Sequence, residues 1–458
     1  MPLKDPLSYY RETILPEFVT ELLHGSGLAP RAGIFTAVTV TWLMIAQRIN
    51  PDRSLSEAVE TLRIHREQEL LELSRGSIRA RANRISESTG GYSQARKRIP
   101  LSVVEQIADR LNQSAFNRFY NPKKRGHDVF VIDGSTLQVA HTPDNLAEYP
   151  QTINQHGKSH YPLVRICVAT HAETGVVCRP SFGPYNGPHA VGEIKLAQGL
   201  LARLPKQAIV VGDRYFGCFR FAHAAQEQGL KLICRMKEIN AASILGCKPT
   251  GIGEQEVKWQ PSKIEKGRYP ELASGSVCGR FVWCPLPQRG KKEQLILFTT
   301  TNLPAKDVVE HYARRWFVET DLRDLKSTLK MNFIDAKSPD TIAKEIVLGS
   351  CAYNLIRLMI GVAAIDAKLS PRKFSFTAAI RRMHSIGIIT FAALSQRHIQ
   401  RSLQIALTDL RGLKLSIRAG PRQSEPRKVW PRGKINTFSN SRENERKQLG
   451  KSKKIKLA

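Results

Sequence analysis

The spacing of apolar residues divides the chain into a helical first part and a mixed part that begins near residue 127. In the first part, LSEAVETLRIHREQELLEL repeats its apolar positions every three or four residues, and the SLSE run at its start resembles a capping box. After residue 127 the pattern changes to short runs of β-branched residues that end in turn-forming residues. These patterns predict about 125 helical residues followed by an α/β region.

Strands and helices are predicted to alternate within the α/β region. The expected strands lie in DVFVIDGSTLQVA, HYPLVRICVATHAETGVVCRP and QAIVVGDRYF, and the expected helices in AVGEIKLAQGLLARL and FRFAHAAQEQGL. Residues from about 236 to 302 are predicted to be rich in strands, in SVCGRFVWCPLP and EQLILFTTTNL. Helices are expected to resume at KDVVEHYARRWF and to continue to about residue 400.

The charge balance points to a polyanionic partner. The 458 residues include 70 Lys and Arg against 40 Asp and Glu, a formal net charge of +30. Such an excess costs self-repulsion in the folded state, so a nucleic acid explains it better than a membrane surface does. Residues 411–458 hold 15 Lys or Arg and 3 Asp or Glu. We expect this segment to be a flexible, phosphate-contacting tail, although a charge run is often only a solvated one.

Membrane and secreted classes are disfavoured. The longest apolar run, residues 346–365, has Asn354 and Arg357 in its middle and is predicted to be a buried helix. The N-terminal segment lacks the apolar region of a secretory signal. The eight cysteines are scattered singly, with no C-x-x-C pair, so neither a zinc ribbon nor a disulfide framework is indicated. We therefore expect a cytoplasmic protein in a reducing compartment.

Two aspartates stand out by their positions. Asp133 follows FVI and Asp213 follows IVVG, so each is expected at the carboxyl end of a buried strand. Each alone is more often a turn former. Functional groups nevertheless collect at strand carboxyl ends, and two such acids in one crevice suit a hard divalent cation such as Mg²⁺ or Mn²⁺.

The segment HYARRWFVETDLRDLKSTLKM, residues 311–331, is predicted to be one amphipathic helix. On a helical wheel Tyr312, Arg315, Glu319 and Lys326 fall in one narrow arc beside the apolar stripe, whereas Asp321 and Asp324 lie on the opposite, solvated side. An ionic group that borders the buried face favours a ligand site. An i,i+4 ion pair between Arg315 and Glu319 explains the same pattern equally well, so geometry leaves both open.

The same four residues carry a resemblance to a known family. Their spacing is Y-x2-R-x3-E-x6-K, without a gap or substitution, and they follow two strand-end aspartates. The chain thereby resembles the DDE transposases of the bacterial insertion sequences of the insertion sequence four type. Similarity also extends to YSQARKRIP, VIDGST, VVGDRYF, TNLPAKDVVEHYARRW and AYNLIRLM, which together reach from about residue 92 to 360.

The resemblance implies a fold and a chemistry. It implies an RNase H-like core in which Asp133, Asp213 and Glu319 bind two Mg²⁺ ions, with Mn²⁺ as a substitute, for cleavage and strand transfer. Arg315 and Lys326 would grip DNA phosphates, and Tyr312 would donate a hydrogen bond to one. The strand-rich residues 236–302 would be the family's β-rich insertion between Asp213 and Glu319.

The tryptophans are assigned by the same resemblance. Some family members stack a flipped base on a Trp of the insertion, for which Trp283 and Trp259 are the candidates. Trp283 is preferred because it leads to the basic loop QRGKK, although packing in the insertion core is the commoner role of such a residue. Trp316 is expected in the core, between the helix and the sheet.

The expected organisation is a helical DNA-binding domain (1–125), a catalytic domain (126–345), C-terminal helices (346–410) and the basic tail (411–458). The first domain contains a group of basic residues that could read inverted repeats: Arg79, Arg81, Arg84, Arg96, Lys97 and Arg98. For any one of them, a place on a solvated helix face is nearly as plausible. The expected partners are double-stranded DNA and, by family analogy, a second copy of the chain in a homodimer. Alternatives are a stand-alone nuclease, or a DNA-binding inhibitor or domesticated element whose catalytic machinery is unused.

Overall fold

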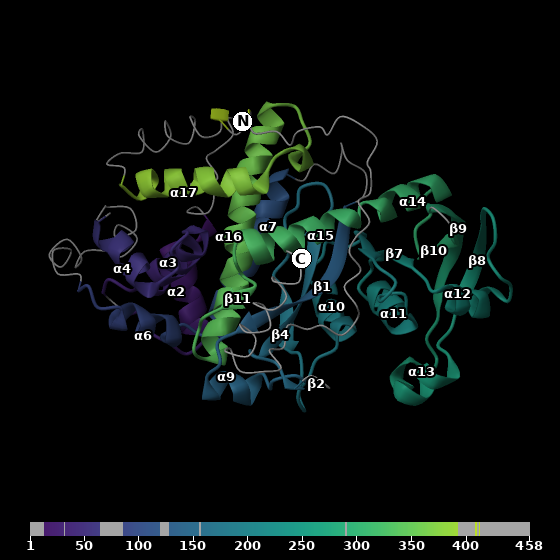
Figure 1. The fold of residues 1–458 in the computed structure, drawn as a ribbon, viewed down its shortest axis with the longest axis horizontal. Helices are drawn as coiled ribbons and strands as arrows, with labels where there is room; N and C mark the ends of the chain where they lie inside the picture. Colours follow the sequence, from purple (N-terminus) through teal and green to yellow (C-terminus); the bar gives the residue numbers. More distant parts are fainter. Residues whose placement is uncertain are drawn as a thin grey trace, which may run out of the picture.

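A mixed sheet lies at the centre of the computed structural model (Figure 1). The structure describes residues 13–31, 33–64, 86–119, 128–154, 157–288, 291–392, 408, 409 and 412. Within these ranges the sheet has nine strands in the order β5-β4-β1-β6-β7-β10-β9-β8, with β11 beside the far end of β1. The strands are β1 (Val129–Val139), β4 (Leu163–His171), β5 (Ser181–Pro184), β6 (Ile209–Gly212), β7 (Lys231–Arg235), β8 (Gly253–Trp259), β9 (Val277–Gln288), β10 (Lys291–Thr299) and β11 (Phe333–Ile334).

Strand directions within this sheet identify its architecture. The central strands β1, β6 and β7 are parallel, and β4 and β5 extend them as antiparallel neighbours on one side. Alternate residues of β1 enter two separate apolar clusters, Val129 and Val131 on one face and Phe130 and Ile132 on the other. Helices cover both faces. The expected α/β class and RNase H-like core are therefore confirmed.

The strand-rich segment continues this sheet instead of forming one of its own. β10 pairs with β7 in antiparallel register, and β9 and β8 follow outward. The segment also contains two helices, α12 (Glu238–Leu245) and α13 (Lys263–Arg268), which the alternating pattern did not indicate. Figure 1 shows this whole extension on one side of the molecule.

The longest helix, α16 (Pro339–Asp366), joins the N-terminal helices to the sheet. It packs against α7 (Leu101–Phe119) and α3 (Ala37–Ile49). By length and composition it could cross a membrane, but its apolar window is entirely buried inside the protein, as predicted. The expected domain boundary at 345–346 falls inside this continuous helix.

Shorter helices complete the described part of the chain. They are α2 (Pro16–Gly25), α4 (Leu55–Ile64), α6 (Gly90–Arg98), α9 (Pro143–Glu148), α10 (Glu193–Leu201), α11 (Phe219–Glu227), α14 (Ala305–Ala313), α15 (Trp316–Arg323) and α17 (Phe376–Ala392). The basic residues Arg79, Arg81 and Arg84, and the tail 411–458 apart from residue 412, lie outside the described residues. All eight cysteines are free thiols.

Candidate active site

Parallel pairing between β1 and β6 places two acids side by side. Val131 is level with Val211 in the register of the two strands. Asp133 and Asp213 each follow two residues later, and the charge of Asp213 acts on Asp133, so the two acids lie close together just beyond the point where the pairing ends. The prediction that Asp133 ends its strand is wrong, because β1 continues to Val139 along β4. It is β6 that ends at Gly212, and this leaves Asp133 without a β6 neighbour.

Because β6 ends at Gly212, the middle of β1 lacks a neighbouring strand on that side, and we call the space beside it the crevice. Residues 133–136 are partly exposed, although the residues before them in the strand are buried. Asp133 Oδ1 accepts a hydrogen bond from the Gly134 amide at 2.9 Å. Asp213 Oδ1 accepts one from the Tyr215 amide at 2.7 Å. Both carboxylates are thus held at the crevice by their own backbone.

The predicted single helix over 311–331 is wrong, because the structure divides the segment into three parts. Tyr312 belongs to α14, Arg315 lies at the N-cap of α15, and Glu319 is in the first turn of α15. Lys326 lies in a π-helical turn, η3 (Asp324–Thr328). The break occurs where the Arg315 amide bonds to the Tyr312 carbonyl, three residues back, at 2.9 Å. Such π turns are frequent at functional sites.

The divided segment still carries its ionic residues to the crevice. Lys326 Nζ donates to Ser135 Oγ at 2.9 Å, and Ser135 follows Asp133 by two residues on the same face of β1. Burial lowers the pKa of the Lys326 ammonium. Arg315 Nη2 bonds Glu319 Oε1 at 3.1 Å, so the i,i+4 ion pair is present as well. The two readings left open by the sequence are therefore compatible.

Neighbouring negative charges make ionisation of this site costly. Burial raises the pKa of Asp133 to about 6, and the charges of Asp213 and Glu319 add to the shift, against the Gly134 amide and Arg315. Burial likewise raises the pKa of Tyr312, which lies near Arg315 and Asp213. Crowded carboxylates of this kind are stabilised by a cation.

A further acid, Glu193, belongs to the same crevice and was missed by the sequence analysis. It lies in the first turn of α10, where an acidic residue is favoured by the helix dipole and attracts no notice. Burial raises the pKa of Glu193 to about 7, with Asp133 and Asp213 as the next causes. No pattern within AVGEIKLAQG distinguishes this Glu from an ordinary helix start.

The carboxylates of Asp133, Asp213 and Glu319 are chemically suited to bind a divalent cation. In this structure they are not arranged around a common point. Carboxylate oxygens are the ligands that Mg²⁺ and Mn²⁺ prefer. Across the described ranges, no three acidic, histidine or cysteine side chains converge closely enough to share a metal ion. All three predicted ligands bond to protein partners, Glu319 to Arg315, Asp213 to the Tyr215 amide and Asp133 to the Gly134 amide. Side-chain rotation of Glu319 would release it toward Asp133.

Two aspartates of α15 and η3 anchor the helix to the core. Asp321 and Asp324 are 1% and 7% exposed, so their predicted place on a solvated face is wrong. Asp321 accepts hydrogen bonds from Arg357 and Arg372, each at 2.6 Å, and from the Tyr353 hydroxyl at 3.1 Å. These partners lie on α16 and the turn after it, and they fix the orientation of the segment that carries Glu319.

Trp316 is also placed differently from the prediction. It is 47% exposed, and its neighbour Phe317 is 36% exposed. The expectation was that Trp316 bridges the helix and the sheet, whereas on a helical wheel it lies opposite the apolar stripe, in agreement with its exposure. An exposed indole therefore lies three residues before Glu319.

The two candidate tryptophans of the extension have different environments. Trp259 is 5% exposed and packs edge-on against Phe219 and Phe298, which excludes it as an accessible stacking surface in this structure. Trp283 is half-buried, lies against Gly253 and donates from Nε1 to the Thr250 carbonyl at 3.2 Å. Trp283 remains the candidate of the two.

The basic cluster of α6 is divided between the core and the surface. Arg96 is 6% exposed and forms an ion pair with Glu345, which also pairs with Arg48 at 2.5 Å. Arg96 therefore does not present its charge to DNA as predicted, because α16 covers it. Lys97 and Arg98 are exposed at the end of α6 and stay candidates for DNA contact.

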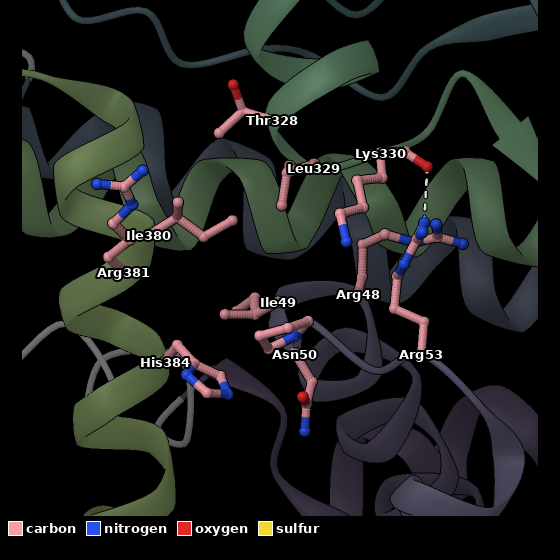
Figure 2. A pocket seen from close by; sticks show the side chains of 11 residues that line it. Arg48, Ile49, Asn50, Arg53, Thr328, Leu329, Lys330, Ile380, Arg381 and His384 are labelled. Carbon is pink, nitrogen blue, oxygen red and sulfur yellow. Dashed lines mark hydrogen bonds between the residues drawn. The ribbon is translucent and has the colours of Figure 1, made fainter.

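A second cationic feature adjoins the end of the signature segment. A pocket of about 360 Å³ lies between the end of α3, the turn after η3 and α17 (Figure 2). Its described lining includes Arg48, Arg53, Lys330, Arg381 and His384, and no Asp or Glu. Arg53 Nη1 donates to the Lys330 carbonyl at 2.7 Å, while its buried Nε has no hydrogen-bond partner among the described residues. We call this feature the basic pocket.

Sequence similarity to known proteins identifies the family of this chain. Residues 124–355, just over half of the chain, match the family model described as "Transposase DDE domain". The chain is 22% identical over 381 residues to the transposase InsG for insertion sequence element IS4 of Escherichia coli (strain K12), covering 82% of this chain and 81% of that protein. A cryo-EM structure of a piggyBac transposase synaptic complex with hairpin DNA aligns over 93% of this chain and 89% of the other, with 11% identity and a TM-score of 0.43. The chain belongs to the DDE transposases and is of the insertion sequence four type.

Proposed function

We propose that this transposase binds the ends of its own insertion sequence, cleaves the DNA there and transfers the freed strands to target DNA. The observation that carries the proposal is the register of β1 and β6. The pairing ends two residues before Asp133 and Asp213, and the bond between Lys326 and Ser135 supports a position of the signature segment beside them. Glu319 completes the proposed catalytic triad from α15.

The proposed chemistry is phosphodiester cleavage and transfer assisted by two Mg²⁺ ions, for which Mn²⁺ would substitute. Held by Asp133, Asp213 and Glu319, the ions would activate the nucleophilic oxygen and stabilise the leaving one. The protein's own part is to align these acids and to shield them partly from water. No Ser or His nucleophile is needed, because water or a DNA 3′-hydroxyl provides the attacking oxygen.

The proposed cations orient the DNA backbone beside the acids. Arg315 offers a planar fork that matches a phosphate, and Lys326 offers a point charge. Tyr312 lies near both Arg315 and Asp213, where its hydroxyl can donate to a phosphate oxygen. Lys330 adds a positive charge to the basic pocket, whose guanidinium and ammonium groups suit further backbone phosphates, although Arg48 is already paired with Glu345.

The wider assembly is proposed on chemical grounds and family analogy. Lys97 and Arg98 would contribute to contacts with the inverted repeats, and Trp283 to stacking on an unpaired base. Joining two element ends at once favours a homodimer that holds both. Double-stranded DNA is the one polyanion that all of these surfaces require.

Lys326→Ala is expected to lower the salt dependence of DNA binding. Each neutralised phosphate contributes about 0.9 to the slope of log K against log salt concentration, so the slope should become less steep by about one. Lys330→Gln should have a similar effect, because it removes one cation from the basic pocket. Fluorescence anisotropy with a labelled element end, repeated over a series of salt concentrations, measures this slope.

Lys337→Ala is the matched control for the slope measurement. Lys337 is 70% exposed and paired with Asp335. It lies in the turn between β11 and α16. Its removal should leave the slope unchanged. An unchanged slope in Lys326→Ala as well would mean that Lys326 serves only to hold Ser135.

A further inference from the structure

The side chain of Glu193 lies directly over the backbone of Gly134. A Cβ atom added at Gly134 would lie 2.2 Å from Cδ and 2.4 Å from Oε1 of Glu193. Real side chains do not tolerate such distances, so any residue larger than glycine would displace the carboxylate. Glycine at position 134 therefore leaves the space that Glu193 occupies.

This contact brings Glu193 into the crevice from the opposite side of the sheet. Gly134 lies between Asp133 and Ser135, in the stretch of β1 that is partly exposed. Glu193 arrives from α10, which packs on β4 and β5. The signature segment arrives through Lys326 on the other face. The carboxylates of the site thus approach β1 from both faces.

Glu193 lies among acids, within electrostatic reach of Asp133 and Asp213, while its carboxylate contacts the backbone of Gly134. Its charge is destabilised first by burial and then by Asp133 and Asp213. Arg165 and the Gly134 amide stabilise it, but they do not outweigh these effects, since the pKa of Glu193 is raised to about 7. A side chain kept for helix stability alone would be less costly on the exposed side of α10.

We propose that Glu193 is a fourth carboxylate of the divalent-metal site, reaching it through the space above Gly134. The assignment rests on the proposed function, since the site is the one that Asp133, Asp213 and Glu319 would form. It adds a residue that the signature does not contain, placed on the helix between the two aspartate-bearing strands. Its role is to contribute a ligand oxygen, direct or through a bound water, on the face of the site away from Glu319.

Binding of Mn²⁺ to the full chain without DNA tests the proposal independently of catalysis. Free Mn²⁺ can be followed by electron paramagnetic resonance during a titration. We expect Glu193→Gln to raise the Kd for Mn²⁺ at least about tenfold, because even outer-shell ligands change metal affinity by about 10–100-fold. Asp133→Asn serves as the reference for loss of an expected ligand.

Glu238→Gln is the matched control, because Glu238 also lies in the first turn of its helix, α12, but pairs with Lys248 at the surface. It should bind Mn²⁺ like the wild type. If Glu193→Gln binds normally while Asp133→Asn binds weakly, the inference is overturned and the proposed function stands. If the wild type itself binds no Mn²⁺, both are overturned.

A second variant, Gly134→Ala, tests the geometry without removing a charge. The added methyl group should push the Glu193 carboxylate aside and raise the Kd for Mn²⁺ by a factor similar to that of Glu193→Gln. The double variant should then be no worse than either single one, because both act on the same ligand. Independent, multiplying effects in the double variant would contradict the proposed path over Gly134.

Discussion

Replacing Glu319 by glutamine is expected to stop DNA cleavage while DNA binding stays nearly unchanged. Glutamine keeps the size of the side chain and can still accept a hydrogen bond from Arg315, but it removes the charge proposed to hold a metal ion. We expect the cleavage rate in Mg²⁺ to fall at least about a thousandfold, equivalent to about 4 kcal/mol of transition-state stabilisation. Product mapping on DNA that carries an element end measures the rate, and anisotropy measures the binding.

Glu310→Gln is the control for this experiment. Glu310 forms an i,i+4 ion pair with Arg314, as Glu319 does with Arg315, but it is 63% exposed and lies on α14, before the break. It should cut at the wild-type rate. Cleavage by Glu319→Gln at the wild-type rate would sink the triad assignment.

The same assay separates the alternative functions. A stand-alone nuclease would cut the element end in Mg²⁺ but would not join the freed strand to target DNA. A protein with unused catalytic machinery would bind the end and leave it intact. Element ends joined to target DNA, in a reaction that depends on Glu319, are expected for a transposase and for neither alternative.

Asp321→Ala is expected to destabilise the fold by about 3–5 kcal/mol. Removing one member of a buried ionic network leaves the others charged and without their partner. Arg357 and Arg372 would lose bonds of 2.6 Å each, and Arg357 is only 3% exposed. Urea unfolding followed by circular dichroism measures the free energy of unfolding.

An exposed aspartate nearby provides the comparison for stability. Asp335 is 77% exposed and pairs with Lys337, so Asp335→Ala should change the free energy of unfolding by less than about 1 kcal/mol. Equal losses in the two variants would show that the network around Asp321 contributes no more than a surface ion pair.

Local pattern was sufficient to predict the sheet and the two aspartates. The runs that end in Asp133 and Asp213 are apolar and β-branched, and strands of this kind form the middle of a parallel sheet whatever lies around them. The acids were therefore predictable as neighbours. The end of Asp133's own strand was not, because it depends on where β6 stops.

The errors concern partners that are distant in sequence. Asp321 was expected in solvent because its arginine partners lie 36 and 51 residues further along the chain, beyond the reach of a helical wheel. Trp316 was expected to bridge the helix and the sheet, but it is 47% exposed. Glu193 carried no local signal, since its importance comes from a glycine on another element. Tertiary contacts decided the positions of Asp321 and Glu193.

The extension of the sheet has a mechanical consequence. β10 pairs with β7 along Ile233, Cys234 and Arg235. The strands of the extension (β8, β9 and β10) therefore belong to the same hydrogen-bonded sheet as β1 and β6, beside which the acids lie. A movement of β9, which carries Trp283, toward the acids would break hydrogen bonds between neighbouring strands of this sheet. If Trp283 and the acids both contact DNA as proposed, we therefore expect the duplex, and not the sheet, to kink or unstack between them.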